Sequence, residues 1–234
     1  MKKNMMITAH NGCEGIPDHT LACIRKGIEV GADCVEIDVR ADENGKLWLI
    51  HDLPADFSGL VPLEEAFALI QESGVAVNCD LKEERAFLPT IALADRCGIG
   101  PRQLIFSGSV DIKVLEARPE LAKRSRVFLN TEVLVKDLTK IGNMHGAEQT
   151  AYLLAHAREA AERFHTLGAE ALNASYRNMP DELIAKMRER DVPLSLWTLN
   201  SEEVLREFMA KDVFNITTRI PTAALRIREE RLNT

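Results

Sequence analysis

The sequence predicts an α/β fold, a closed (β/α)8 TIM barrel with an added β-hairpin strand after its second strand. Short apolar or β-branched runs alternate with helix-like stretches along the whole chain, which is the pattern of repeated βα units around a parallel sheet. The length of 234 residues falls within the range of one such barrel. We therefore expect a single domain over residues 1–234. An open doubly wound sheet is the alternative, although no G-x-G-x-x-G follows the first strand.

Eight short runs rich in Val, Ile, Leu and Phe are the predicted barrel strands. They cover residues 5–10, 34–40, 76–82, 103–107, 126–131, 170–174, 193–199 and 214–218. Each is followed by an amphipathic stretch. In residues 20–31, for example, Leu21, Ile24 and Ile28 share one helical face and Gly31 ends the helix. Residues 181–190 form a second clear example, which ends before a proline that opens the next strand.

Two segments depart from this alternation. In residues 44–52 the dipeptide Asn44-Gly45 predicts a tight turn, and the apolar run after it predicts a strand with no helix between. This hairpin on the second strand would bring His51 over the mouth of the barrel. Residues 133–147 contain glycines and show no clean period, so we expect a long loop or a lid there, with His145 on the surface.

Composition limits the possible partners. The net charge is −7 and no Lys/Arg-rich cluster occurs, which argues against nucleic acid and anionic membranes and favours a small soluble substrate. No apolar run approaches the ~18 residues that span a bilayer, so no membrane insertion is expected. The five cysteines are scattered without C-x-x-C spacing and no secretion signal begins the chain, which together favour the cytoplasm. A homo-oligomer stays open.

The most informative pattern is a pair of acids in the second predicted strand. Glu36 and Asp38 alternate with Val35, Ile37 and Val39, so both carboxylates project from the same face of the strand. In a strand covered by helices that face is interior, and like charges held together there are costly unless a cation intervenes. A divalent metal site is therefore predicted, with a solvated strand face as the ordinary alternative.

Further polar residues follow other strands at the same end of the barrel, where active sites of this fold lie. They are His10, Asp80, Lys82 and, from the hairpin, His51. Oxygen ligands suit hard cations such as Mg²⁺, Ca²⁺ or Mn²⁺. Two imidazoles can divide proton transfer, and a hard cation with a lysine stabilises an anion whose charge grows in the transition state. This set favours phosphoryl transfer. Singly, each residue also has an ordinary structural explanation.

These residues lie in a series of motifs that resembles the glycerophosphodiester phosphodiesterase family. The family pattern is A-H-R-G, P-E-N-T, G-A-D-x-x-E-x-D-V, a D-G turn and H-D. The matching segments here are Ala9-His10-Asn11-Gly12, Pro17-Asp18-His19-Thr20, residues 31–39, residues 42–45 and His51-Asp52. Asp80-Leu81-Lys82 resembles a later D-L-K strand, and residues 197–200 and 216–221 resemble the W-T-V-N and T-D-x-P segments. The resemblance spans almost the whole chain.

The resemblance implies a TIM-barrel phosphoric diester hydrolase. One divalent cation, Mg²⁺ or Ca²⁺ with Mn²⁺ also possible, would be bound by the residues that match Glu36, Asp38 and Asp80. His10 and His51 would be the catalytic acid and base, and Lys82 would bind the phosphate. The expected reaction is hydrolysis of a glycerophosphodiester to an alcohol and sn-glycerol 3-phosphate.

Asn11 and His19 are departures from the family pattern, and two other activities stay open. Asn11 stands where the family has an arginine that contacts the phosphate, so we expect Asn11 at the substrate with an altered phosphate contact. His19 has no counterpart with an assigned role. Trp197, near the end of the seventh strand, is a candidate floor for the alcohol group, with packing beneath a helix as the alternative. The alternative functions are a phospholipase D-like lyase that forms a cyclic phosphate and a non-catalytic phosphodiester-binding protein.

Overall fold

The computed structural model describes residues 5–141 and 144–233, and within them eight parallel strands close into a barrel. The barrel strands are β1 (Met6–Ala9), β2 (Cys34–Ala41), β4 (Ala76–Leu81), β5 (Leu104–Gly108), β6 (Arg126–Asn130), β7 (Ala171–Ser175), β8 (Leu194–Trp197) and β9 (Asn215–Thr218). β1 pairs with β9 on one side and with β2 on the other, which closes the ring. The predicted TIM barrel is confirmed, and each barrel strand overlaps one of the predicted ranges.

The ninth strand of the sheet is the predicted hairpin strand. β3 (Leu47–Leu49) pairs antiparallel with β2 and lies outside the ring. The turn between them is built by Asp42, whose Oδ1 accepts hydrogen bonds from the backbone N–H groups of Asn44 and Lys46 at 2.8 and 3.0 Å. Gly45 adopts φ 79°, a conformation that favours glycine.

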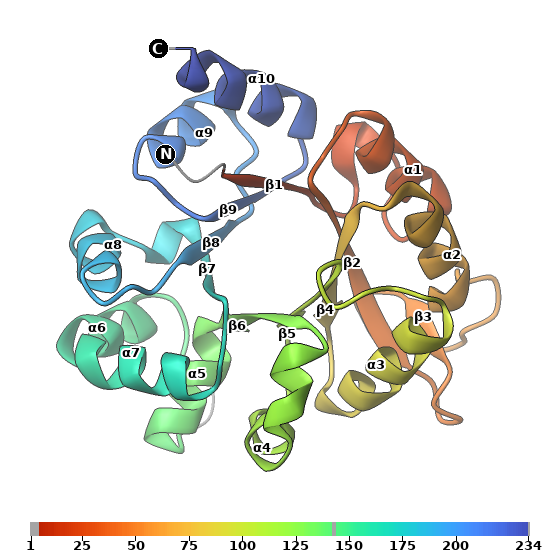
Figure 1. Ribbon diagram of the computed structural model, residues 1–234, viewed down its shortest axis with the longest axis horizontal. Coiled ribbons are helices and arrows are strands. Elements are labelled where there is room, and N and C mark those ends of the chain that lie inside the picture. Colours follow the sequence, from red (N-terminus) through yellow and green to blue (C-terminus); the bar gives the residue numbers. More distant parts are fainter. Residues whose placement is uncertain (1–4, 142–143, 234) are drawn as a thin grey trace.

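Helices surround the strands, as the view along the barrel shows (Figure 1). They are α1 (Leu21–Glu29), α2 (Leu63–Ser73), α3 (Phe87–Arg96), α4 (Ile112–Ala117), α5 (Thr131–Thr139), α6 (Ala147–Ala155), α7 (Ala157–Thr166), α8 (Asp181–Arg188), α9 (Glu202–Met209) and α10 (Pro221–Leu232). Three of them begin at a side-chain cap, since Thr20, Asp111 and Ser201 accept hydrogen bonds from backbone N–H groups of the first turn.

The expected loop over residues 133–147 is wrong for most of its described part. α5 extends to Thr139, because Leu134 and Val135 are buried and Leu138 packs on the same core. The apolar stripe of α5 is short, and the glycines that follow it obscure its helical period. α6 begins at Ala147, and His145 in the connection is exposed as expected. Residues 142–143 lie outside the described residues.

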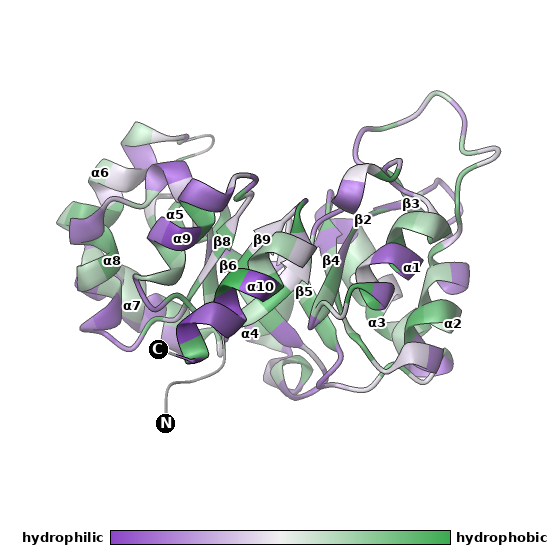
Figure 2. Cartoon of the chain, turned by 90° about the horizontal axis from the view of Figure 1, so that it is seen from above, coloured by the Kyte–Doolittle hydropathy of each residue, from purple (hydrophilic) through white to green (hydrophobic). Residues whose placement is uncertain are grey.

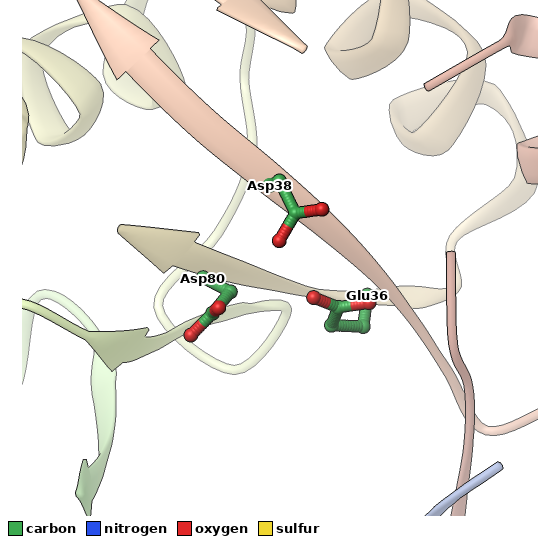
Figure 3. Close-up of side chains that lie close together, drawn as sticks. All are labelled: Glu36, Asp38 and Asp80. Carbon is green, nitrogen blue, oxygen red and sulfur yellow. The ribbon is translucent and has the colours of Figure 1, made fainter. Parts of the chain in front are cut away.

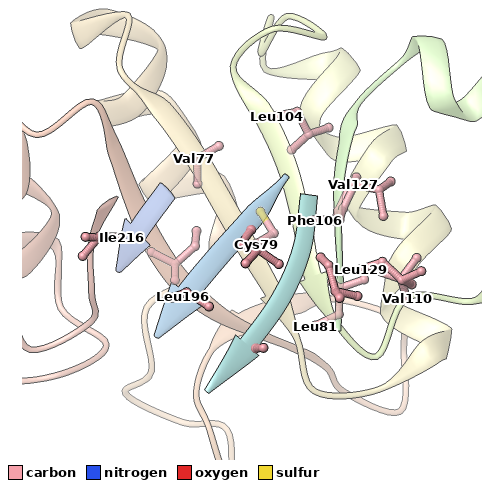
Figure 4. Close-up of a cluster of buried hydrophobic side chains, with 14 of the residues drawn as sticks. Val77, Cys79, Leu81, Leu104, Phe106, Val110, Val127, Leu129, Leu196 and Ile216 are labelled. Carbon is pink, nitrogen blue, oxygen red and sulfur yellow. The ribbon is translucent and has the colours of Figure 1, made fainter. Parts of the chain in front are cut away.

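The two faces of the strands have different roles. Outward side chains such as Val77, Cys79 and Leu81 of β4 pack with neighbours from other strands into the large core beneath the helices (Figure 4). Figure 2 shows the strands mostly hydrophobic and the helices with polar residues as well. Inside the barrel a smaller apolar cluster fills the end at which the strands begin; it contains Cys34, Ile105, Phe128 and Ala171. The opposite end is left to polar side chains.

Within residues 5–141 and 144–233, no helix combines the length and the apolar character needed to cross a bilayer.

Candidate active site

A cavity of about 710 Å³ opens at the carboxyl ends of the barrel strands. Seven of the eight residues singled out from the sequence line it, namely His10, Glu36, Asp38, His51, Asp80, Lys82 and Trp197. Further polar residues from the carboxyl-terminal parts of β5, β6 and β7 and from the start of α5 line it as well, namely Ser107, Asn130, Asn173 and Glu132. Among the described lining residues, Asn11 is absent. The alternation within each strand therefore brings residues from distant parts of the chain to one space.

Three carboxylates converge at the floor of this cavity. Asp38 of β2 lies in register with Asp80 of β4, and Glu36 lies one step lower on the same inward face. One oxygen of each carboxylate lies within 4.8 Å of the others, and the three side chains lie close together (Figure 3). Burial, reinforced by the charges of Asp38 and Asp80, raises the pKa of Glu36 well above its usual range.

Lys82 lies among these carboxylates. Its Nζ is 2.7 Å from Oδ1 of Asp38 and also contacts Oδ2 of Asp80. Burial alone would lower the pKa of Lys82, but Asp80 and Asp38 outweigh it and raise this pKa, so the ammonium stays charged. For Asp38, burial alone would raise the pKa, but Lys82 and Asn11 outweigh burial and lower this pKa. Asp38 is thus held ionised while Glu36 is pushed toward its neutral form.

The surroundings of the carboxylates fit a hard cation. The Oγ of Ser107 donates to Oδ1 of Asp80 at 2.7 Å and so orients that carboxylate. Asn78 of β4 lies beside Glu36 of β2, lines the cavity and is 4% exposed. In the described part of the chain its Oδ1 is the one buried side-chain oxygen or nitrogen without a hydrogen-bond partner. An amide oxygen beside three carboxylates is the ligand chemistry of Mg²⁺ and Ca²⁺.

His10 lies beside the carboxylates with a defined hydrogen pattern. Its Nδ1 is 2.5 Å from the backbone oxygen of Asn11, and because a carbonyl oxygen only accepts, Nδ1 carries the hydrogen. Nε2 is then free to accept a proton and lies 3.9 Å from Oε2 of Glu36. Burial lowers the pKa of His10, and the positive charge of Arg219 contributes to this, so the neutral ring predominates at pH 7.

The second predicted histidine lies at the rim of the cavity. The side chain of His51 is 60% exposed, and its Nδ1 lies 2.8 Å from Oδ1 of Asp52. The Nε of Arg40 donates to the backbone oxygen of His51 at 2.8 Å, which ties the segment after β3 to β2. His51 therefore faces solvent, whereas His10 is largely enclosed.

Asn11 is buried and turned toward the carboxylates. Its backbone N–H donates to Oε2 of Glu36 at 3.0 Å, and its Nδ2 donates to Oδ2 of Asp38 at 3.0 Å. The same Nδ2 lies 2.6 Å from Nδ1 of His19, whose backbone N–H donates to Oδ1 of Asn11 at 2.7 Å. These contacts keep His19 at φ 58° and bring its ring to the cavity wall. His19 thus gains a place in the site that the sequence did not assign.

Arg219 is the residue that the sequence reasoning missed. It follows β9, its side chain lines the cavity, and its Nη2 lies 3.1 Å from Oδ2 of Asp18. Its Nε is 3.4 Å from Nδ1 of His10. Its position directly after a barrel strand could have indicated a place in the site. The residues that Arg219 contacts, however, lie about 200 residues away along the chain.

Comparison with known proteins accords with this geometry. The model of the glycerophosphoryl diester phosphodiesterase family matches residues 10–84. A glycerophosphodiester phosphodiesterase from Caldanaerobacter subterraneus subsp. tengcongensis is 22% identical, over 95% of this chain and 97% of that protein. The crystal structure of a glycerophosphodiester phosphodiesterase from Parabacteroides distasonis matches with a TM-score of 0.74 at 15% identity, over 99% of this chain and 100% of that one.

A further solved structure carries a ligand. An Oleispira antarctica phosphodiesterase, in complex with the product sn-glycerol-3-phosphate, matches with a TM-score of 0.71 at 17% identity, over 96% of both chains. The resemblance to the glycerophosphodiester phosphodiesterase family is confirmed, and these homologues are phosphoric diester hydrolases.

Proposed function

We propose that this chain, a homologue of the glycerophosphodiester phosphodiesterases, is a metal-dependent phosphodiesterase that hydrolyses glycerophosphodiesters to an alcohol and sn-glycerol 3-phosphate. The observation that carries the proposal is the convergence of three carboxylates, a lysine and a largely buried histidine in one cavity. Such a site can bind a cation and a phosphate together and still offer a proton acceptor. The proposed substrate is a small molecule; the absence of nucleic acid partners and the cytoplasmic location stay predictions.

Glu36, Asp38 and Asp80 would hold one divalent cation, Mg²⁺ or Ca²⁺, with Mn²⁺ as a further candidate. Their mutual approach within 4.8 Å and the unpartnered oxygen of Asn78 support this assignment. When bound, the cation would polarise a phosphoryl oxygen and neutralise part of the charge of the diester. Lys82 would add a fixed positive charge for the phosphate beside these carboxylates.

The two histidines would divide the proton transfers. His10 suits the role of base, because its Nε2 is unprotonated and burial lowers its pKa. His51 would deliver a proton to the departing alcohol from the rim, where Asp52 orients its ring. The attacking group can be water or a hydroxyl of the substrate's own glycerol, which would give a cyclic phosphate first.

Two further residues would shape the rest of the site. Trp197 lines the cavity at the end of β8 and would contact the alcohol group. Asn11, predicted at the substrate, is enclosed by Glu36, Asp38 and His19, so we propose that it positions the carboxylates and does not contact the phosphate directly.

Turnover of glycerophosphodiesters tests the proposed reaction. Purified protein supplied with several glycerophosphodiesters is expected to release glycerol 3-phosphate with Mg²⁺, Ca²⁺ or Mn²⁺ and not with EDTA. His10→Gln should lower kcat by about 10²- to 10⁴-fold, the usual contribution of a positioned proton acceptor. His145→Gln, a change at an exposed histidine outside the cavity, is the matched control and should leave kcat unchanged. Phosphorus NMR identifies the product directly.

Three other results of that experiment would each contradict the proposal in a different way. A stable cyclic phosphate as the sole product would favour the lyase. Binding of substrate without any product would favour a non-catalytic binding protein. Full activity in EDTA-treated, metal-free protein would show that the reaction requires no cation.

Cation binding at this site is expected to release a proton. Because burial and the neighbouring carboxylates raise the pKa of Glu36, the metal-free site retains a proton that a cation must displace. Binding should release up to about one proton near neutral pH, and the apparent affinity should rise with pH. Isothermal titration in buffers of different ionisation enthalpy measures this number. Heats that are identical in all buffers at pH 6 to 7 would show that Glu36 is already ionised.

A further inference from the structure

The cavity contains few positive charges that are available to an anion. Its described lining includes six carboxylates, those of Asp18, Glu36, Asp38, Asp52, Asp80 and Glu132. The only lysine or arginine side chains in the same described lining are Lys82 and Arg219. Lys82 is held between Asp38 and Asp80, so its charge is largely balanced within the protein. Of these two cations, Arg219 is therefore the one that lies outside the cluster formed by Glu36, Asp38 and Asp80.

The guanidinium of Arg219 is held in place and only partly engaged. Its side chain is 44% exposed, and its Nη2 contacts one oxygen of Asp18. Its Nε approaches Nδ1 of His10, but that nitrogen already carries a hydrogen directed at the backbone oxygen of Asn11. Nε–H thus finds no acceptor there, and of the five N–H donors of a guanidinium most remain for an anion.

His10 lies between this guanidinium and the carboxylates. Its Nε2 is 3.9 Å from Glu36, whereas its Nδ1 is 3.4 Å from Arg219 on the other side of the ring. A phosphate that contacts both Arg219 and a cation on the carboxylates must therefore lie against His10, the proposed proton acceptor. A planar guanidinium binds phosphate oxygens in pairs, which also fixes the orientation of the group.

We propose that Arg219 is the phosphate-binding arginine of this site, contributed by the segment after β9 and held by Asp18. This inference rests on the proposed function, since it names a residue that binds the substrate of that reaction. The ion pair with Asp18 would then serve to position the guanidinium. As an exposed pair, with side chains 44% and 41% exposed, it contributes little to the stability of the fold.

Product binding without turnover tests the inference. Isothermal titration of sn-glycerol 3-phosphate into the Mg²⁺-loaded protein should give a dissociation constant that is about 10- to 100-fold higher for Arg219→Gln than for the original chain. Arg219→Lys should recover part of the loss, because it restores the charge without the planar fork. Asp18→Asn should change the constant only a few-fold. Arg25→Gln, an exposed arginine on α1 outside the cavity lining, is the matched control and should have no effect.

The outcomes separate this inference from the function on which it rests. If the original chain binds and forms the product but Arg219→Gln binds it equally well, the role of Arg219 is overturned and the phosphodiesterase stands. If Arg219→Gln and Asp18→Asn lower the melting temperature alike and leave product binding intact, the pair is only structural. If the original chain neither binds nor forms glycerol 3-phosphate, the proposed function fails and this inference fails with it.

Discussion

Glu36→Gln is expected to abolish turnover and, at the same time, to stabilise the metal-free protein. Replacing one of the three proposed carboxylate ligands should lower kcat/KM at least about 10³-fold, since a bound cation contributes several kcal/mol of transition-state stabilisation. The opposite effect on stability follows from the raised pKa of Glu36, which burial and then Asp38 and Asp80 cause. Ionised Glu36 opposes folding, and a neutral glutamine keeps an oxygen for the N–H of Asn11.

The stabilisation of the metal-free protein by Glu36→Gln should increase with pH. Because the pKa of Glu36 is higher in the folded chain than in the unfolded chain, raising the pH ionises Glu36 at the expense of the fold. The advantage of glutamine should be absent below pH 4.5, the ordinary pKa, and should grow toward neutral pH. Urea unfolding of the EDTA-treated proteins at several pH values measures it.

Asp38→Asn is the matched comparison, because it also removes one proposed ligand but should have the opposite effect on stability. Lys82 and Asn11 lower the pKa of Asp38 against the effect of burial, so ionised Asp38 stabilises the fold. Both variants should lose activity, and both should lose the stabilisation that added Mg²⁺ gives the original chain. Equal destabilisation of the metal-free protein by the two substitutions would contradict the assignment of the charge states.

The parts of this site that the sequence predicted follow from strand geometry. Alternation in β2 and β4 places Glu36, Asp38 and Asp80 on the inner face whatever the helices do, because the side-chain period of a strand is two. The carboxyl ends of parallel strands also meet at one end of a barrel, so the sequence alone places His10 and Lys82 near the carboxylates.

The parts that were missed depend on contacts between distant segments. Arg219 contacts Asp18, which lies about 200 residues away in the sequence, and the local periodicity of the sequence does not predict such a contact. The burial of Asn11 depends on the loop that carries His19, whose left-handed backbone is not readable from its residue type. α5 was predicted as a loop because the glycines after it obscured a short apolar stripe that only packing reveals.

Gly108→Ala is expected to damage both the fold and the proposed cation site. Gly108 ends β5 at φ 73°, where a residue with a side chain costs about 1–2 kcal/mol. A Cβ there would also lie 2.3 Å from the backbone oxygen of Leu81 and 2.7 Å from Oδ1 of Asp80. The backbone cannot move as a flexible side chain would, so overlap should add about 1–3 kcal/mol. Asp80 would be displaced from its hydrogen bond with Ser107.

Gly74→Ala separates these two contributions. Gly74 has nearly the same backbone angle, φ 72°, but a Cβ added to it would meet no described atom within 4 Å, so alanine there should cost only the conformational part. Urea unfolding should therefore rank the proteins as original, Gly74→Ala and Gly108→Ala in order of falling stability. Titration with Mg²⁺ should show weakened binding in Gly108→Ala alone. If the two variants were equally stable and bound Mg²⁺ equally well, the close approach of β5 to Asp80 would have no role in holding the carboxylate, and the cation site would depend on β2 and β4 alone.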